Sequence, residues 1–418
     1  MIRSLYSLVV VAAQPFLRHK LRRRGRAEPG YLRHVGERFG TYEQPAQAGA
    51  WWIHAVSLGE TRAAGILIEH LRRLKPDVRV LLTHGTATGR AEGERWVRAG
   101  DAQAWLPWDT PRAVQRFLNH FQPAAGVLME TEVWPNLVAA AKEAGVPLAL
   151  ANARLSAKSL AGTLRLASLS RPAYASLSAV WAQTDADARR LAEAGATVKG
   201  VYGNLKFDAA PDESLLERGR LWRETTPRPV VMFASSREGE EAEFVRVLQS
   251  NPAAAKQVQW LIVPRHPQRF DEVASLVKQN GFGISRRSQW DAEPVPADVW
   301  IGDSLGEMAF YYGMADCALL GGSFEKLGGQ NLIEAAACGC PVVMGPHTFN
   351  FTEAAELSQE AGAAFRVRTL QEGVRQAAEL VAARARQQQA AAAARGFAAA
   401  NQGAAFKTAE AVISLTLR

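Results

Sequence analysis

Four polar residue pairs with the same spacing are candidates for binding or catalysis. In each pair a serine or asparagine precedes a glutamate by three residues at a predicted strand-to-helix junction: Ser57/Glu60, Ser235/Glu238, Ser304/Glu307 and Asn331/Glu334. The spacing fits a capping box, which stabilises a helix start by about 1 kcal/mol. The same junctions lie at the carboxyl ends of predicted parallel strands, where α/β sheets bind ligands. Both interpretations hold together at this point.

The first half of the chain supplies carboxylates at two such strand ends. Glu60 follows one apolar run, and Glu130 and Glu132 follow another, so the sequence places carboxylates at one edge of a sheet. One carboxylate there suits a general base toward a hydroxyl, and a second suits support of a developing positive charge. Lys206, within the string GNLKFD, suits contact with an anionic group of a ligand, although the residues alone favour a solvated lysine.

Loops of the second half combine glycines with polar groups after predicted strands, and we expect them to converge on a nucleotide. They are Pro264-Arg265-His266, Gly302 through Glu307, Gly321-Gly322-Ser323 and Gly328 through Asn331. Glycines permit close backbone approach, and a helix starting near Asn331 offers free N–H groups to a phosphate. A glutamate near such a helix start suits ribose hydroxyls.

Several other kinds of site find no support in the sequence. The Asp185-Ala186-Asp187 pair lies at the start of a predicted helix, so we expect no metal-bound diphosphate donor there, and the absence of a Gly-x-x-x-x-Gly-Lys-Ser/Thr loop argues against a kinase. The histidines and the odd number of cysteines lack metal-ligand spacing, and the tryptophans mostly adjoin apolar runs and predict packing. The residues considered are four of the eight histidines (His54, His84, His266 and His347), the three cysteines (Cys317, Cys338 and Cys340) and five of the eleven tryptophans (Trp51, Trp52, Trp105, Trp108 and Trp134).

The elements that must position these loops follow an alternating pattern. Strand-like apolar runs at 51–56, 78–83, 126–130, 147–152 and 179–183 alternate with amphipathic stretches, and a second series occurs at 229–234, 259–263, 299–301, 315–320 and 341–344. Such alternation predicts α/β domains with parallel sheets. At 418 residues the chain is too long for one ordinary core. Two Rossmann-like domains are therefore expected.

We place the expected boundaries at composition changes. Residues 1–28 form an anchor with a basic collar, 29–208 a first Rossmann-like domain, and 209–228 a linker region with a short helix. A second Rossmann-like domain covers 229–395, and 396–418 form a C-terminal helix that packs back on the first domain, with Gly396 as the break.

The amino-terminal segment is expected to bind a membrane surface. Residues 2–17 are apolar but shorter than the roughly 20 residues needed to span, and a basic cluster follows them. That order does not fit a signal peptide, and cations beside an apolar segment favour an anionic cytoplasmic face. No RNA- or DNA-binding motif accompanies the cluster, so nucleic acid is not an expected partner. The cluster holds much of the net charge of +8: Arg18, Lys20, Arg22, Arg23, Arg24 and Arg26.

Seven strings along nearly the whole chain resemble the family that transfers 3-deoxy-D-manno-octulosonic acid (Kdo) onto lipid A. They are VSLGETRAA (56–64), METEVWPN (129–136), GNLKFD (203–208), PRHPQRF (264–270), GDSLGEM (302–308), GGQNLIEAA (328–336) and MGPHTFNF (344–351). The resemblance implies a GT-B glycosyltransferase whose two domains enclose a cleft. CMP-Kdo is then the donor, lipid IVA the acceptor, and transfer inverts the sugar without a metal or other cofactor.

Residue roles follow from the same resemblance. Glu60 matches the general base, and Glu130 and Lys206 match residues that support the transition state. The CMP site matches Pro264, Arg265, Leu305, Gly306, Glu307, Asn331, Leu332, Ile333 and Glu334. The implied location is the cytoplasmic face of the bacterial inner membrane.

Two other function classes remain open from pattern alone. A nucleotide-sugar epimerase would share the α/β domains, but it needs no apolar segment followed by cations. A membrane-bound binding protein without catalysis would not need Glu60, Glu130 and Lys206 together.

Overall fold

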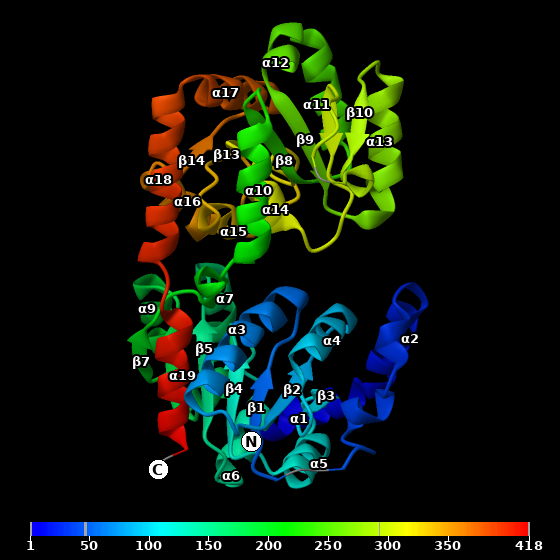
Figure 1. Cartoon of the computed structure of the whole chain (residues 1–418). Coiled ribbons are helices and arrows are strands. Elements are labelled where there is room, and N and C mark those ends of the chain that lie inside the picture. The colour runs from blue at the N-terminus through cyan, green and yellow to red at the C-terminus, as the bar shows by residue number, and fades with distance from the viewer. Residues whose placement is uncertain (1, 46–47, 292, 417–418) are drawn as a thin grey trace. The chain divides into compact units, whose positions relative to one another are not determined.

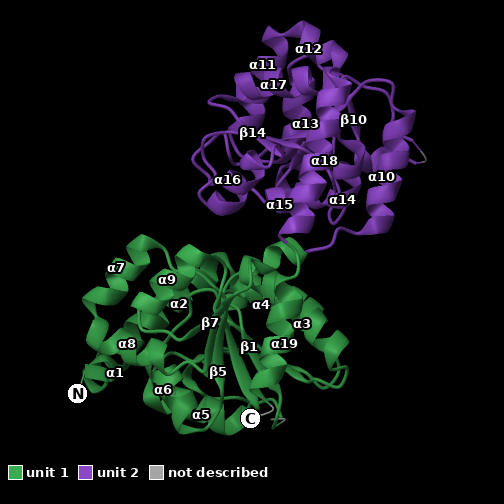
Figure 2. Cartoon of the chain, turned by 90° about the vertical axis from the view of Figure 1, so that its left-hand side faces the viewer, with its two compact units in different colours: residues 1–208, 402–418 green, residues 209–401 purple. Residues whose placement is uncertain are grey.

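The computed structural model describes residues 2–45, 48–291 and 293–416, which form two α/β units. Unit 1 comprises residues 1–208 and 402–418, and unit 2 comprises residues 209–401 (Figure 2). Each unit contains one seven-stranded parallel sheet with helices on both faces (Figure 1). Two α/β domains with parallel sheets are thus confirmed.

The sheet of unit 1 has the strand order β3-β2-β1-β4-β5-β6-β7. The chain runs outward from β1 to β3 and then returns to place β4 on the other side of β1, so the strand order reverses between β1 and β4. The strands are β1 (Trp51–His54), β2 (Val80–His84), β3 (Ala102–Trp105), β4 (Ala125–Met129), β5 (Leu148–Ala153), β6 (Ala179–Ala182) and β7 (Val198–Val201).

Helices cover both faces of this sheet, and the last helix of the chain, α19, packs against α3. They are α1 (Ile2–Ala12), α2 (Gln14–Ala27), α3 (Leu58–Leu74), α4 (Ala87–Gly93), α5 (Pro111–Phe121), α6 (Pro135–Glu143), α7 (Ala157–Arg165), α8 (Ala167–Ala175), α9 (Asp185–Glu193) and α19 (Ala404–Leu415), with 3-10 turns η1 (Pro29–Leu32), η2 (Val35–Phe39), η3 (Glu94–Trp96) and η4 (Leu205–Asp208).

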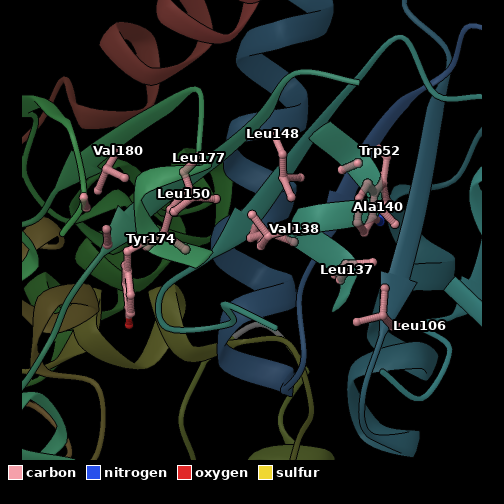
Figure 3. Packing of buried hydrophobic residues seen from close by; sticks show 14 of the residues in the cluster. Trp52, Leu106, Leu137, Val138, Ala140, Leu148, Leu150, Tyr174, Leu177 and Val180 are labelled. Atoms are coloured by element: carbon pink, nitrogen blue, oxygen red, sulfur yellow. The ribbon is translucent and has the colours of Figure 1, made fainter. Parts of the chain in front are cut away.

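Successive side chains of β1 enter different cores, because strand residues alternate between the two faces of a sheet. Trp52 packs with Leu137, Leu148 and other residues on one face (Figure 3). Trp51 and Ile53 pack on the opposite face, in the cluster that includes Ala405 and Val412 of α19. Burial on both faces explains why the central strands read as continuous apolar runs.

Unit 2 has the strand order β10-β11-β9-β8-β12-β13-β14, which reverses between β8 and β12. Its strands are β8 (Val230–Ser236), β9 (Gln259–Pro264), β10 (Ile284–Arg286), β11 (Val299–Ile301), β12 (Cys317–Leu320), β13 (Val342–Met344) and β14 (Ala364–Arg366). Its helices are α10 (Glu213–Thr225), α11 (Glu240–Ser250), α12 (Pro252–Gln257), α13 (Phe270–Gln279), α14 (Met308–Met314), α15 (Leu332–Ala337), α16 (Thr352–Glu360), α17 (Leu370–Ala382) and α18 (Arg384–Ala400), with 3-10 turns η5 (Pro267–Arg269) and η6 (Arg287–Gln289).

Two segments differ from the expected domain boundaries. The expected linker 209–228 consists largely of α10, which packs closely on α14 within unit 2 because Gly219 and Gly313 allow the helices to approach. The expected break at Gly396 does not occur, because α18 continues through it to Ala400 in an alanine-rich run of high helix propensity. The chain returns to unit 1 only after Asn401.

The amino-terminal segment forms two helices, α1 and α2. Within the described residues, no helix has the length and apolar character needed to cross a membrane. α1 is tied to unit 1 by hydrogen bonds from Tyr6 Oη to Asp109 (2.9 Å) and from Ser7 Oγ to Asn136 (3.0 Å).

Candidate active site

The predicted carboxylates of unit 1 flank the point where its strand order reverses. β1 and β4 are parallel neighbours, Glu60 lies in the first turn of the helix after β1, and Glu130 directly follows β4. Ligands of open α/β sheets bind outside the carboxyl ends of strands at such a point. The fold therefore places both carboxylates where a ligand is expected.

Glu60 forms a variant of the predicted capping box, in which its side chain binds the N–H of Val56, the residue before the N-cap. Its backbone N–H donates to Ser57 Oγ (3.4 Å), while its carboxylate accepts from Ser57 Oγ (2.9 Å) and from the Val56 N–H (2.9 Å). Burial raises the pKa of Glu60, the Val56 N–H opposes that shift, and the negative charges of Glu130 and Glu132 add to it. A carboxylate with a raised pKa is a stronger proton acceptor. Capping and a role as base are thus compatible at Glu60.

Glu130 is held in a strained and fully paired position. It is buried and adopts a left-handed backbone with φ of 59°, a conformation that costs a non-glycine residue roughly 1–3 kcal/mol. Its Oε2 accepts from Arg154 (2.7 Å), and its Oε1 lies 3.3 Å from Lys206 Nζ. The structure therefore brings Glu130 and Lys206 into direct contact.

Lys206 is positioned by residues far away in sequence. It lies on η4, where Asn152 Oδ1 accepts from the Leu205 N–H (3.0 Å). Asp208, at the end of the same turn, accepts from the N–H groups of Gly403 and Ala405 at the start of α19. The negative Asp208 at the N-terminus of α19 is favourable. The carboxy-terminal helix thus fixes the turn that presents Lys206.

In unit 2 the predicted nucleotide-binding residues follow β9, β11 and β12 at one edge of the sheet. Pro264 ends β9, and the Arg265 N–H donates to Ser236 O (3.0 Å). Leu305 is highly exposed, and Gly306 has a φ of 81°, which favours glycine. The structure thus gathers these loops at the carboxyl edge of the sheet.

Glu307 is bound by two arginines rather than capping a helix. Its Oε1 accepts from Arg218 (2.5 Å) and Arg287 (2.8 Å), and its Oε2 accepts from Ser304 Oγ. Burial works to raise the pKa of Glu307, but Ser304 and the arginines outweigh it and lower the pKa. α14 begins only at Met308, without a side-chain cap, so the Ser304/Glu307 capping box is not formed.

Asn331 does cap its helix, accepting from the Ile333 N–H (3.2 Å). Leu332 and Ile333 are each 1% exposed. Their side chains pack into the core, so any contact of these two residues with a ligand is limited to the backbone. Glu334 lies half-buried in the first turn of α15.

The sequence interpretation missed Glu240. The Ser235/Glu238 pair was expected to start a helix, but Ser235 has a φ of 54° and α11 begins at Glu240. The buried Glu240 carboxylate accepts from the N–H groups of Arg237 (2.9 Å), Gly322 (2.8 Å) and Phe324 (3.2 Å), and so joins the loops after β8 and β12. Its closeness to a positive-φ glycine, Gly239, was the available signal.

The histidines, cysteines and tryptophans considered above differ in how deeply they are buried. Burial lowers the pKa of His54 and of His84 to about 3, and the three cysteines are buried thiols with raised pKa values. Among the described residues no group of three or more His, Cys, Asp or Glu side chains is arranged to hold a metal ion. Trp52 and Trp105 are core residues, but Trp134 is 41% exposed, and its expected packing role is wrong.

The chain is similar to known proteins both in sequence and in fold. A family model described as 3-deoxy-D-manno-octulosonic-acid transferase (kdotransferase) matches residues 33–209. The 3-deoxy-D-manno-octulosonic acid transferase of Bordetella pertussis is 48% identical over 423 residues, which cover 98% of each chain.

Two solved structures share the fold at low identity. A glycosyltransferase from Rickettsia africae has a TM-score of 0.56 and 13% identity, covering 88% of this chain and 99% of that one. A UDP-GlcNAc 2-epimerase from Neisseria meningitidis has a TM-score of 0.54 and 14% identity, with the same coverage. The fold alone therefore does not separate a transferase from an epimerase, whereas the identity over the whole chain does.

Proposed function

Because the chain belongs to the Kdo transferase family and is therefore a glycosyltransferase, we propose that it transfers Kdo from CMP-Kdo to lipid IVA. The proposal extends to a GT-B architecture and to metal-independent transfer with inversion at the sugar. The epimerase alternative has no support beyond the shared fold.

The observation that carries the proposal is the carboxylate arrangement after β1 and β4. Glu60 takes the proton of the acceptor hydroxyl as that oxygen bonds to the anomeric carbon of Kdo and CMP departs. Burial and the nearby charge of Glu130 raise the pKa of Glu60 toward the working pH, which favours proton transfer. Glu130 supports the positive charge that develops on the sugar.

Lys206 completes this arrangement with a positive charge. Its Nζ lies 3.3 Å from Glu130 Oε1, and its side chain is 27% exposed. An ammonium group that is held at one oxygen and still reachable from solvent suits an anionic group of the donor, either the Kdo carboxylate or the departing phosphate.

CMP is assigned to unit 2. Arg265, Gly306, Glu307 and Asn331 lie on loops at the carboxyl edge of its sheet, where nucleotides bind in open α/β folds. Glu307 keeps two arginines in place, and glycine at position 306 permits backbone approach.

The amino-terminal helices support a location on the cytoplasmic face of the bacterial inner membrane. α1 exposes Ile2, Leu5, Leu8, Val9 and Val11, and α2 exposes Phe16 ahead of the basic cluster at 18–26. An apolar surface beside cations suits in-plane binding to an anionic bilayer. Replacing Leu5, Leu8 and Phe16 with serine should reduce flotation with anionic vesicles. The same change at the exposed Leu166, Leu221 and Phe406 should not.

The decisive experiment incubates the purified protein with CMP-Kdo and tetraacylated lipid A precursor in detergent, following CMP release and the mass of the lipid. A lipid that gains one or more Kdo residues supports the proposal and counts the additions. CMP release without a change in lipid mass would show donor hydrolysis and contradict the proposed acceptor. If folded protein gives neither CMP release nor a heavier lipid, the proposed donor is contradicted as well.

A further inference from the structure

Unit 1 contains a cavity of about 290 Å³ beside the carboxylate site. Residues at the carboxyl ends of β1, β2 and β3 form part of its lining, and α2 contributes another part. Val56 lines the cavity and also donates its backbone N–H to Glu60 (2.9 Å). A group bound in this cavity would therefore lie next to the proposed base.

Arg38 is the unusual residue of the cavity. It is 3% exposed, its guanidinium lies 4.0 Å from the centre of the Trp105 ring, and its Nη2 donates to Gly85 O (3.1 Å). Its Nε is buried without a hydrogen-bond partner, and so is Nε1 of Trp108. Unsatisfied buried donors, above all on a charged group, are costly.

Within the described part of the chain no carboxylate forms a salt bridge with Arg38, although the charge of Glu37 acts on it from nearby. The neighbouring Glu37 instead pairs with Arg90 (2.7 Å) and accepts from the Trp105 N–H (2.8 Å). Burial lowers the pKa of Arg38 to about 10, which still leaves the group cationic at neutral pH. A buried cation without a salt-bridge partner suits an anion that arrives with a ligand.

The other charged groups of the cavity leave an excess of cations. Lys20 and Arg24 reach it from α2. Asp109 and Glu132 also line it, but Asp109 accepts from Tyr6 Oη and from the N–H groups that start α6, and Glu132 accepts from Trp134 Nε1 (2.7 Å). Three cations therefore face the cavity, against two carboxylates that already have partners.

We propose that this cavity binds a phosphate ester of the acylated acceptor, with Arg38, Lys20 and Arg24 around the phosphate. The inference rests on the proposed function, whose acceptor is a phosphorylated and acylated sugar. Leu17, Leu21 and Trp134 supply an apolar wall beside the cations, which suits the lipid-bearing part of the same molecule. Fixing the phosphate here positions the acceptor hydroxyl toward Glu60.

The test uses matched double variants of one helix. Lys20→Gln/Arg24→Gln removes two cavity cations, whereas Arg22→Gln/Arg23→Gln removes two exposed cations of α2 that do not line the cavity. Binding of the phosphorylated acceptor in detergent micelles, without donor, is followed by tryptophan fluorescence, since Trp108 and Trp134 line the site. The cavity variant should bind about tenfold more weakly, because charge-assisted hydrogen bonds are lost.

A dephosphorylated acceptor provides the second comparison. The wild-type protein should bind it about as weakly as the cavity variant binds the phosphorylated form, and the cavity substitutions should then add little. Arg38→Gln should behave like the cavity variant, and Arg38→Lys should recover part of the affinity because it keeps the charge.

Three outcomes would overturn the inference. The first is equal weakening of acceptor binding by both double variants, and the second is an affinity that does not depend on the acceptor phosphate. The third is displacement of the acceptor by phosphatidic acid when its affinity does not depend on its own phosphate, which would assign the cavity to a bilayer headgroup. Because this binding needs no donor, its failure is distinguishable from failure of Kdo transfer in the mass assay.

Discussion

At the carboxyl edges of two similar sheets, the pKa values of Glu60 in unit 1 and Glu307 in unit 2 are shifted in opposite directions. In unit 1, Glu60 lies near other carboxylates, and its pKa is raised by burial and by their charges. In unit 2, Asp303 is buried and Glu307 is half-buried, yet arginines and serines outweigh the effect of burial and lower both pKa values. Both sheets reverse their strand order at the centre, so topology does not explain the difference.

The contrast shows that strand order determines where the carboxylates lie, whereas neighbouring side chains determine the direction in which their pKa values shift. A carboxylate with a raised pKa is suited to take up a proton, and one with a lowered pKa is suited to stay charged and orient donors. In both units a strained residue lies at the carboxyl end of a strand at the reversal point, Glu130 directly after β4 and Ser235 within the last two residues of β8. Such strain is commonly kept at functional sites.

The largest expected effect comes from removing the proposed base. Glu60→Gln should lower kcat about a thousandfold, because glutamine cannot accept the proton, while its carbonyl oxygen still accepts from the Val56 N–H and keeps the helix start. Steady-state kinetics with CMP-Kdo and lipid IVA measure this. Glu132→Gln, at a neighbouring carboxyl whose pKa burial also raises, is the control and should lose less than tenfold. Equal losses would remove Glu60 from the base role.

The second prediction tests the charge coupling in unit 1. Glu130→Gln should lower kcat about a hundredfold, because support of the developing positive charge is lost. It should also move the acidic limb of the pH–kcat profile to lower pH, because Glu130 raises the pKa of Glu60 and its removal lets that pKa fall. Arg154→Gln keeps the Glu130 charge and should not move the limb downward. If the acidic limb of the pH–kcat profile stays in place in Glu130→Gln, the charge of Glu130 does not raise the pKa of Glu60.

The third prediction concerns Glu307 of unit 2, whose pKa is lowered. Glu307→Gln should raise the KM for CMP-Kdo about tenfold with little change in kcat, because it loosens Arg218 and Arg287 without touching the base. Since the folded-state pKa of Glu307 is lowered, its contribution to stability is present above the unfolded pKa of about 4.5 and is lost as pH falls through the folded pKa.

The melting temperature of Glu307→Gln should consequently fall less steeply below about pH 4.5 than that of the wild type. A parallel fall in both proteins would contradict the lowered pKa. A loss in kcat as large as that of Glu60→Gln would contradict the division of roles between the units.

The smallest expected effect separates capping from chemistry at Ser57. Ser57→Ala and Thr184→Ala each remove a helix cap in unit 1 and should each cost about 1 kcal/mol in the free energy of unfolding. Only Ser57→Ala should move the acidic limb to higher pH, because Ser57 also donates to the Glu60 carboxylate and lowers its pKa. Chemical denaturation and pH–rate profiles measure the two effects. If the two variants have identical pH–rate profiles, Ser57 caps the helix but does not lower the pKa of Glu60.

The amino-acid pattern is sufficient to predict the central strands of both sheets and the residues that follow them. β1, β4, β8 and β12 are buried on every residue or nearly so, and continuous apolar runs reveal such strands without any structure. The strands absent from the sequence prediction, β3, β7, β10 and β14, are the edges of the two sheets. Edge strands are partly exposed and short, so they leave no continuous apolar run.

Which polar residues contact one another depends on long-range packing and cannot be predicted from spacing. Ser57 and Asn331 start helices as their spacing predicts, but Ser235 and Ser304 do not. After Ser235 the helix begins only at Glu240, which accepts from the Gly322 N–H, and after Ser304 the Glu307 carboxylate binds Arg218 of α10. The contact of Lys206 with Glu130 spans 76 positions and depends on the return of α19. The unpaired state of Arg38 likewise results from the partner that Glu37 finds. Spacing fixes local geometry, whereas long-range packing decides which charges are compensated.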